Sequence, residues 1–252
     1  MTTGVLFIGH GTRRQHGVDE FLTFVQQVLS QVDSTPGLVF GYAFLELQSP
    51  DIIEGIRTMA NQGVTRIVCI PLFLFAAGHI KEDIPVELAR ANEQFPDVTL
   101  HLGDPFGTER EMMDALFTRV MDCFSDPSAG VGILLLGRGN KDKSAQDAFM
   151  QVARDLHSHF PGSTVDVGFL AGTGTAMESG LDSLVDRGVR SLVIMPYLWF
   201  SGWLTDTLPR RVGLWREEHP DADVRIARHL GIHPQIVKLV ARRVAKALDV
   251  LT

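Results

Sequence analysis

Three side chains with metal-binding or proton-accepting chemistry each follow an apolar run in the first half of the chain. His10 stands between two glycines after the run 5–8, Glu46 ends the stretch that contains YAFL, and His79 follows PLFLF. Imidazole nitrogens and carboxylate oxygens bind borderline divalent metals, and they accept protons near neutral pH. Taken singly, a turn histidine, a solvated glutamate and a capping or core histidine are the ordinary alternatives.

The elements that must position these side chains are repeated βα units. Each half alternates short apolar runs with amphipathic stretches, which is typical of helices packed around a parallel sheet. Ser49-Pro50 and Thr108, followed by Glu111, are interpreted as helix starts. The carboxyl ends of parallel strands meet at one edge of a sheet, so the three side chains are expected to converge there. The strands are predicted at residues 5–8, 39–45, 66–70 and 98–102, and at 132–136, 165–170, 191–195 and 224–227.

The chain also repeats itself, which predicts two similar domains. The expected fold class is α/β, with a four-stranded parallel sheet flanked by helices in each domain and the active site in the cleft between the domains. The domains are predicted at 1–126 and 130–252, joined near 125–129. The aligned segments are 4–13 with 132–141, 40–56 with 165–181, 63–75 with 188–200 and, with a one-residue gap, 76–85 with 201–209.

The second half keeps the scaffold but not the chemistry. The positions that align with His10, Glu46 and His79 carry Arg138, Ala171 and Trp203. An arginine neither ligates a metal nor acts as a base at neutral pH, but its planar fork suits a carboxylate, and tryptophan offers a flat apolar face. We therefore expect the metal and catalytic residues in the first domain only, with Arg138 and Trp203 binding the substrate.

Basic residues stand beside both sets of positions in a chain that is acidic as a whole. Arg13, Arg14 and Lys81 flank the two histidines, and Lys141 and Lys143 follow Arg138, while the formal net charge of the chain is -7. Each of them alone is most often a solvated surface residue, but their clustering indicates a local binding site for a small anionic ligand. The negative net charge argues against a nucleic-acid partner.

Composition excludes several other classes of function. With 252 residues, of which 45% are hydrophobic and 21% charged, the chain has ordinary globular composition. Its apolar runs are shorter than a membrane helix needs and its first residues show no secretory signal, so a cytoplasmic location without membrane association is expected. Cys69 and Cys123 form no CxxC pair and are expected to be buried small side chains. A GxxxxGK[ST] phosphate loop is also missing from the sequence.

Three segments resemble the class II chelatases that act on sirohydrochlorin, in their two-domain form. They are GHGTR at 9–13, LELQSPDI at 45–52 and PLFLFAAGHIKEDIP at 71–85. The resemblance covers essentially the whole chain. It implies a lyase, a sirohydrochlorin ferrochelatase or cobaltochelatase, that inserts Fe²⁺ or Co²⁺ into sirohydrochlorin without ATP. In the iron case this is the last step of siroheme synthesis. It also implies that His10, His79 and Glu46 ligate the metal and accept protons, with the metal as a substrate and no permanent cofactor.

Alternatives stay open within and beyond this reading. The chain lacks the His-rich tract and the C-terminal Cys motif of the long cobalt-specific forms, which favours iron over the cobaltochelatase reaction of cobalamin synthesis. Nickel would suit the same ligands as iron or cobalt, and a different tetrapyrrole as substrate is a further alternative. A non-catalytic carrier of metal or tetrapyrrole is the alternative from another class. Because two fused halves supply two walls in one chain, a monomer is expected.

Overall fold

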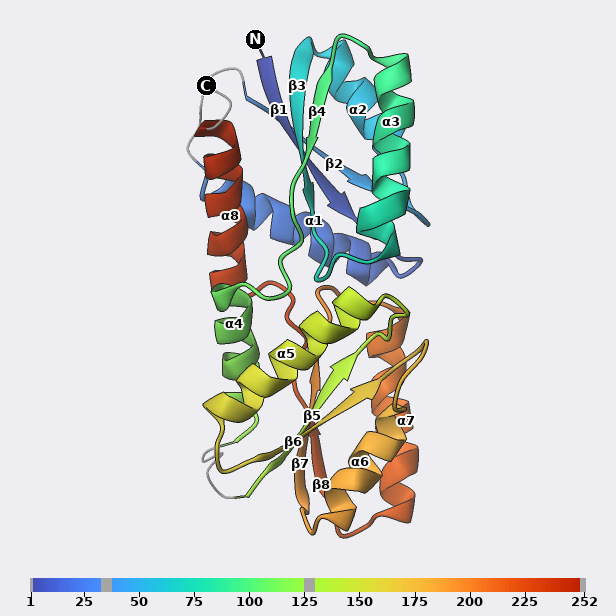
Figure 1. Cartoon of the computed structure of the whole chain (residues 1–252), viewed down its shortest axis with the longest axis vertical. Helices are drawn as coiled ribbons and strands as arrows, with labels where there is room; N and C mark the ends of the chain where they lie inside the picture. Colours follow the sequence, from blue (N-terminus) through green and yellow to red (C-terminus); the bar gives the residue numbers. More distant parts are fainter. Residues whose placement is uncertain (1, 33–37, 125–129, 250–252) are drawn as a thin grey trace. The chain divides into compact units, whose positions relative to one another are not determined.

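The computed structural model of the protein describes residues 2–32, 38–124 and 130–249, and two compact units make up the fold (Figure 1). The first unit comprises Met1–Phe106 together with Pro234–Thr252, and the second comprises Gly107–His233. The predicted linker at 125–129 lies outside the described residues.

The first unit is a four-stranded parallel sheet with the strand order β2-β1-β3-β4. Central strand β1 is buried along residues 4–9, as expected of a strand covered on both faces. The elements of the first unit are β1 (Thr2–Gly9), α1 (Gln15–Leu29), β2 (Val39–Phe44), α2 (Ile52–Asn61), β3 (Val64–Pro71), the π-helical turn η1 (His79–Asp83), α3 (Ile84–Gln94), β4 (Thr99–Leu102) and α8 (Pro234–Asp249).

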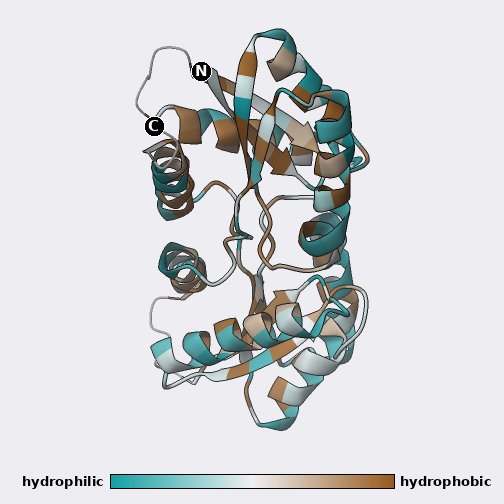
Figure 2. Ribbon diagram, turned by 45° about the horizontal axis from the view of Figure 1, so that its top comes forward, coloured by the Kyte–Doolittle hydropathy of each residue, from teal (hydrophilic) through white to brown (hydrophobic). Residues whose placement is uncertain are grey.

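Alternation along β1 explains why helices cover both faces of this sheet. Ile8 belongs to a core cluster with Ile56 of α2 and Ile84 of α3. The next residue, Gly9, points to the opposite face, where a Cβ would lie 2.7 Å from the ring of Phe21 on α1. Helix α8 packs against α1. In Figure 2 the hydrophobic segments are concentrated in the strands, while the helices mix hydrophobic and hydrophilic residues.

The second unit repeats the plan with the strand order β6-β5-β7-β8, again parallel throughout. All eight predicted strands are confirmed, and their ends differ from the predicted ones by at most three residues. The elements of the second unit are α4 (Arg110–Met121), β5 (Gly132–Gly137), α5 (Lys143–His159), β6 (Thr164–Phe169), α6 (Met177–Asp186), β7 (Ser191–Pro196), α7 (Trp203–Glu218) and β8 (Asp223–Ile226).

The last helix of each predicted domain belongs to the other compact unit. Helix α4, which ends the first half of the sequence, contacts α5 and β7 of the second unit, and α8 packs on the first unit. Buried Arg119 of α4 donates to the carbonyl oxygens of His229 and Leu230, both at 3.1 Å. Arg243 of α8 donates to the carbonyl oxygen of Asp104 at 2.7 Å. The predicted boundaries followed the sequence repeat, which does not specify on which sheet an amphipathic helix packs.

Both predicted helix starts are wrong in their details. The cap of α2 is Asp51, not Ser49, because its carboxylate accepts from the N–H of Glu54 at 2.8 Å and the Glu54 carboxylate accepts from the Asp51 N–H at 2.9 Å. Helix α4 begins after Glu109 and has no side-chain cap. Cys69 is buried, which raises the pKa of its thiol to about 12, and Cys123 is half-buried. No helix within the described part of the chain is long and apolar enough to cross a membrane.

Candidate functional site

The β1–β2 ladder continues past the ends of both strands and brings His10 beside Glu46. The Leu45 N–H donates to the Gly9 carbonyl at 2.9 Å, and the Glu46 N–H donates to the His10 carbonyl at 3.1 Å. The side chains then approach, with His10 Nε2 3.4 Å from Glu46 Oε1. Glu46 therefore points toward His10, a placement that depends on strand register.

Gly11 makes this close approach possible. Its φ is +93°, and a Cβ built on it would lie 1.8 Å from the Glu46 carbonyl oxygen. Gly139 has the same geometry in the second unit, with φ +99° and a Cβ that would lie 1.8 Å from the Ala171 carbonyl oxygen. The Ala171 N–H donates to the Arg138 carbonyl at 2.8 Å, so Arg138 and Ala171 occupy the places of His10 and Glu46. The structure thus confirms the predicted alignment of these positions.

His79 is the first residue of η1 and meets His10 edge to face. The two ring centroids are 4.8 Å apart, with an interplanar angle of 80°. Phe73 lies next to both imidazoles, with centroid distances of 6.3 Å to His10 and 6.2 Å to His79. The position of His79 at the start of a helical turn, expected from the sequence, is also found.

Asp83 is a partner of His79 that sequence reasoning missed. Its Oδ2 lies 2.7 Å from His79 Nδ1, across the η1 turn. The spacing of four residues between a histidine and a carboxylate within one expected helix was a signal for this contact.

Hydrogen-bond chemistry decides which ring nitrogens carry protons. A carbonyl oxygen only accepts, so His10 Nδ1–H donates to the Gly11 carbonyl at 3.1 Å. A carboxylate likewise accepts, so His79 Nδ1–H donates to Asp83. In the neutral ring His79 then holds its lone pair on Nε2. The Nε2 atom of His10 faces the Glu46 carboxylate at 3.4 Å, so these two atoms suit a cation held between them.

The predicted residues come together in pairs, His10 with Glu46 and His10 with His79. Within residues 2–32, 38–124 and 130–249, no group of three His, Cys, Asp or Glu side chains could already hold a metal ion. The chemistry that the geometry supports is therefore that of a pair of imidazoles with an adjoining carboxylate, open to an incoming ligand.

The predicted substrate-binding residues have exposed side chains in both units. Arg13 and Arg14 lie between β1 and α1, close in sequence to His10, and Lys81 lies in η1, two residues after His79. Arg138 follows β5 in the second unit, and Trp203 begins α7 with 60% of its surface exposed. The three basic residues of the first unit therefore lie on the same two loops as the imidazole pair.

The loop that carries Glu46 has an unusual backbone at its next residue. Leu47 has φ 65° and is the only non-glycine residue with positive φ in the part of the chain that the structure describes. Its aligned partner is Gly172, with φ 73°. Both loops are tied alike, since Gln48 donates to the Thr12 carbonyl at 2.8 Å and Thr173 to the Asn140 carbonyl at 3.1 Å. The loop conformation therefore suits glycine, and Leu47 adopts it at a cost in backbone strain.

Swapping the two residues should reveal this strain. Leu47→Gly is expected to leave the free energy of unfolding within about 1 kcal/mol of wild type, because relief of strain offsets the greater freedom of glycine when unfolded. Gly172→Leu is expected to lower the free energy of unfolding by about 1–2 kcal/mol. Urea denaturation measures both. A loss in Leu47→Gly as large as that in Gly172→Leu would show that the leucine side chain is needed for packing.

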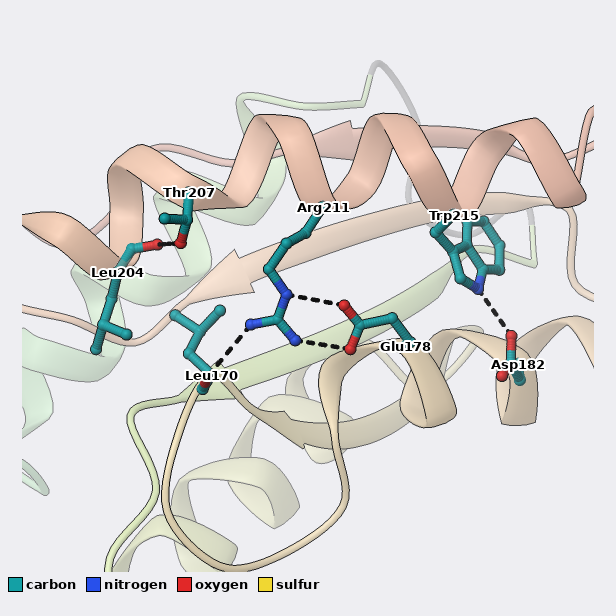
Figure 3. A network of polar contacts seen from close by, with 7 residues as sticks. All are labelled: Leu170, Glu178, Asp182, Leu204, Thr207, Arg211 and Trp215. Carbon is teal, nitrogen blue, oxygen red and sulfur yellow. Dashed lines mark hydrogen bonds and ion pairs between the residues drawn. The ribbon is translucent and has the colours of Figure 1, made fainter.

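In the second unit an ion-pair network fastens the loop that corresponds to the Glu46 loop (Figure 3). Arg211 of α7 donates from Nε and Nη2 to the two carboxylate oxygens of Glu178, at 2.8 and 2.7 Å, and from Nη1 to the Leu170 carbonyl at 3.2 Å. The aligned positions in the first unit are Glu87 and Ile53, which cannot form such a pair. The network therefore stabilises the second unit and has no counterpart at the aligned positions of the first unit.

This network predicts how stability depends on pH. The hydrogen bond from Arg211 holds the pKa of Glu178 below its ordinary value of 4.5. A carboxyl group with a lowered folded-state pKa contributes stability above its unfolded pKa, and this contribution is lost as pH falls through the folded pKa. Glu178→Gln should therefore lose less thermal stability than wild type between neutral pH and pH values below 4.5. Exposed Glu217→Gln is the control. The same dependence of melting temperature on pH in the wild type and both variants would contradict the prediction.

Comparisons with known proteins agree with this architecture. A family model described as CbiX matches residues 4–123 and again residues 132–247. The chain is 30% identical to the sirohydrochlorin ferrochelatase of Bacillus subtilis (strain 168), over 97% of this chain and 91% of that protein. It is 28% identical to the sirohydrochlorin cobaltochelatase of Priestia megaterium, over 97% of this chain and 80% of that protein.

Solved structures show the same likeness. The sirohydrochlorin chelatase SirB from Bacillus subtilis subspecies spizizenii, in complex with cobalt, superposes with a TM-score of 0.81 at 28% identity, over 98% of this chain and 95% of that chain. SirB from Bacillus subtilis with Fe³⁺ gives a TM-score of 0.82 at 28% identity. Because the family model covers both halves and these likenesses span nearly the whole chain, the protein belongs to the CbiX family of class II chelatases.

Proposed function

We propose that the protein inserts Fe²⁺, or alternatively Co²⁺, into sirohydrochlorin. The observation that carries the proposal is the edge-to-face contact of His10 and His79, with Glu46 adjoining His10, in a chain of the CbiX family. Relatives named as sirohydrochlorin ferrochelatase and cobaltochelatase support the choice of substrate. Metal insertion needs groups that hold a divalent ion and then release it, and groups that take up two pyrrolic protons.

The His10–Glu46 pair suits the first task. Two donors bound about 2.1 Å from one ion lie roughly 3.0–3.4 Å apart. The distance from His10 Nε2 to Glu46 Oε1 is 3.4 Å, which fits two ligands of the same metal. A small number of protein ligands is suitable for a metal ion that must be released, because the four nitrogens of the macrocycle take over its coordination.

Proton uptake is the second task, and neutral imidazole suits it. His79 Nδ1–H is held by Asp83, which leaves Nε2 as the accepting atom. We propose that His10 and His79, together with Glu46, share the delivery of the metal and the uptake of the two protons.

The remaining predictions concern the substrate's carboxylates and ring. We propose that Arg13, Arg14 and Lys81 bind the carboxylates, because their exposed side chains come from the two loops that carry His10 and His79. The roles of Arg138 and Trp203 in substrate binding stay predictions, as do the monomeric state and the cytoplasmic location. The reaction is proposed to need no nucleotide and no permanent cofactor, so added ATP should not change the rate.

A spectroscopic assay tests the proposed function. Purified protein is mixed with sirohydrochlorin and either Fe²⁺, under anaerobic conditions, or Co²⁺, and the visible spectrum is followed. The expected result is insertion well above the protein-free rate with at least one metal, and the ratio of kcat/KM values identifies the preferred ion. Rates equal to the protein-free control with both metals would contradict the proposal.

A further inference from the structure

The contact between His79 and Asp83 has no counterpart in the second unit. Counting from the last aligned position, Thr207 stands where Asp83 stands and Trp203 where His79 stands. The Thr207 hydroxyl donates to the Leu204 carbonyl at 3.0 Å, within its own helix (Figure 3). Imidazole and carboxylate are therefore both present in the first unit and both replaced in the second.

A local difference in backbone accompanies this pair. Between the aligned residues Phe75 and Pro85 the first half has nine residues, 76–84, whereas the second half has eight, 201–208, between Phe200 and Pro209. The longer segment contains the π-helical turn η1, while the shorter one enters the regular helix α7 at Trp203. Short π-helical turns often occur at functional sites. In the first unit this turn begins at His79 and ends at Asp83.

Stability does not explain the pair. The side chains of His79 and Asp83 are 34% and 54% exposed, and exposed pairs of this kind contribute little to folding. What the contact does determine is the tautomer and the orientation of the imidazole. An acceptor 2.7 Å from Nδ1 keeps the proton on that atom, orients the ring and leaves the lone pair on Nε2.

We propose that Asp83 is a positioning residue, which holds His79 in its Nδ1–H form with Nε2 directed to the reacting metal and macrocycle. The inference deepens the proposed function and rests on it. Asp83 itself touches neither metal nor substrate in this scheme. It acts through His79, as carboxylates that hydrogen-bond to metal-binding histidines commonly do.

Kinetics of three variants test the role. Asp83→Ala is expected to lower kcat for metal insertion about 10- to 100-fold, with little change in KM for sirohydrochlorin. Asp83→Asn should recover part of the rate, because the amide oxygen accepts the same hydrogen bond. Glu82→Ala is the matched control, since it removes a neighbouring exposed carboxylate of the same turn, and it should behave as wild type.

A tautomer measurement keeps the inference separate from the proposed function. Two-bond ¹H–¹⁵N correlation spectra of the metal-free protein should show His79 in the Nδ1–H form in wild type and a mixture of tautomers in Asp83→Ala. Melting temperatures should match. If wild type metallates sirohydrochlorin but Asp83→Ala retains both its kcat and its tautomer, the inference is overturned. It is also overturned if Asp83→Asn keeps the tautomer yet loses as much activity as Asp83→Ala, because the carboxylate would then act directly. A wild type without metallation would overturn the proposed function instead, while the spectra would still report on Asp83.

Discussion

His79→Ala is expected to lower the rate of metal insertion into sirohydrochlorin by about 10²- to 10⁴-fold, the range for loss of a positioned proton-transfer group. The variant removes one of the two imidazoles, whose ring centroids lie 4.8 Å apart, and with it an Nε2 lone pair. Binding of the metal-free macrocycle should remain within a few-fold of wild type, since the proposed carboxylate contacts come from other residues. Stopped-flow insertion kinetics and equilibrium binding followed by sirohydrochlorin fluorescence measure the two effects separately.

The matched control is His101→Ala, which removes an exposed imidazole from β4 in the same unit and should leave both measurements unchanged. A carrier without catalysis would behave differently. In that case His79→Ala would reduce binding and apparent insertion in the same proportion, and stoichiometric binding without turnover would be seen in the wild type.

Gly11→Ala is expected to have the largest effect on stability, a loss of about 3–5 kcal/mol in the free energy of unfolding. The added Cβ would lie 1.8 Å from the Glu46 carbonyl oxygen, a backbone atom that cannot rotate away, at a φ of +93°. Relief requires the two loops to separate, which would also break the approach of His10 to Glu46. Metal insertion should therefore fall even at temperatures where the variant is folded. Denaturant titration and the insertion assay measure the two consequences.

Two other glycines separate the causes of this loss. Gly63 has φ +81° with no atom near its would-be Cβ, so Gly63→Ala should cost only about 1 kcal/mol. Gly139→Ala reproduces the clash of Gly11→Ala in the second unit and should destabilise the protein similarly. Co²⁺ binding to the His10–Glu46 pair should be retained in this variant. Equal losses in Gly11→Ala and Gly63→Ala would mean that backbone conformation, not the clash, causes the effect.

Much of the fold follows from patterns that a sequence displays directly. The apolar runs around β1 and β5 are long enough to be buried strands and too short for helices that span a membrane, and the repeat doubles the evidence for each element. Helix starts were predicted less well, because Ser49 and Asp51 are both good caps and the choice depends on where the loop after β2 turns back. That turn is set by contacts with the β1 loop, such as the bond from Gln48 to the Thr12 carbonyl.

The sequence by itself determined the residue types and their order: His10, Glu46 and His79, each after a different parallel strand, and their replacement in the second half. Only the tertiary structure decided the rest. Strand register turned Glu46 toward His10, the π-helical turn brought Asp83 to His79, and packing placed α4 and α8 on the units that they cover. The physical reason is that hydrophobic periodicity reports which face of an element is buried, whereas hydrogen-bond partners and packing neighbours depend on contacts between residues far apart in the chain.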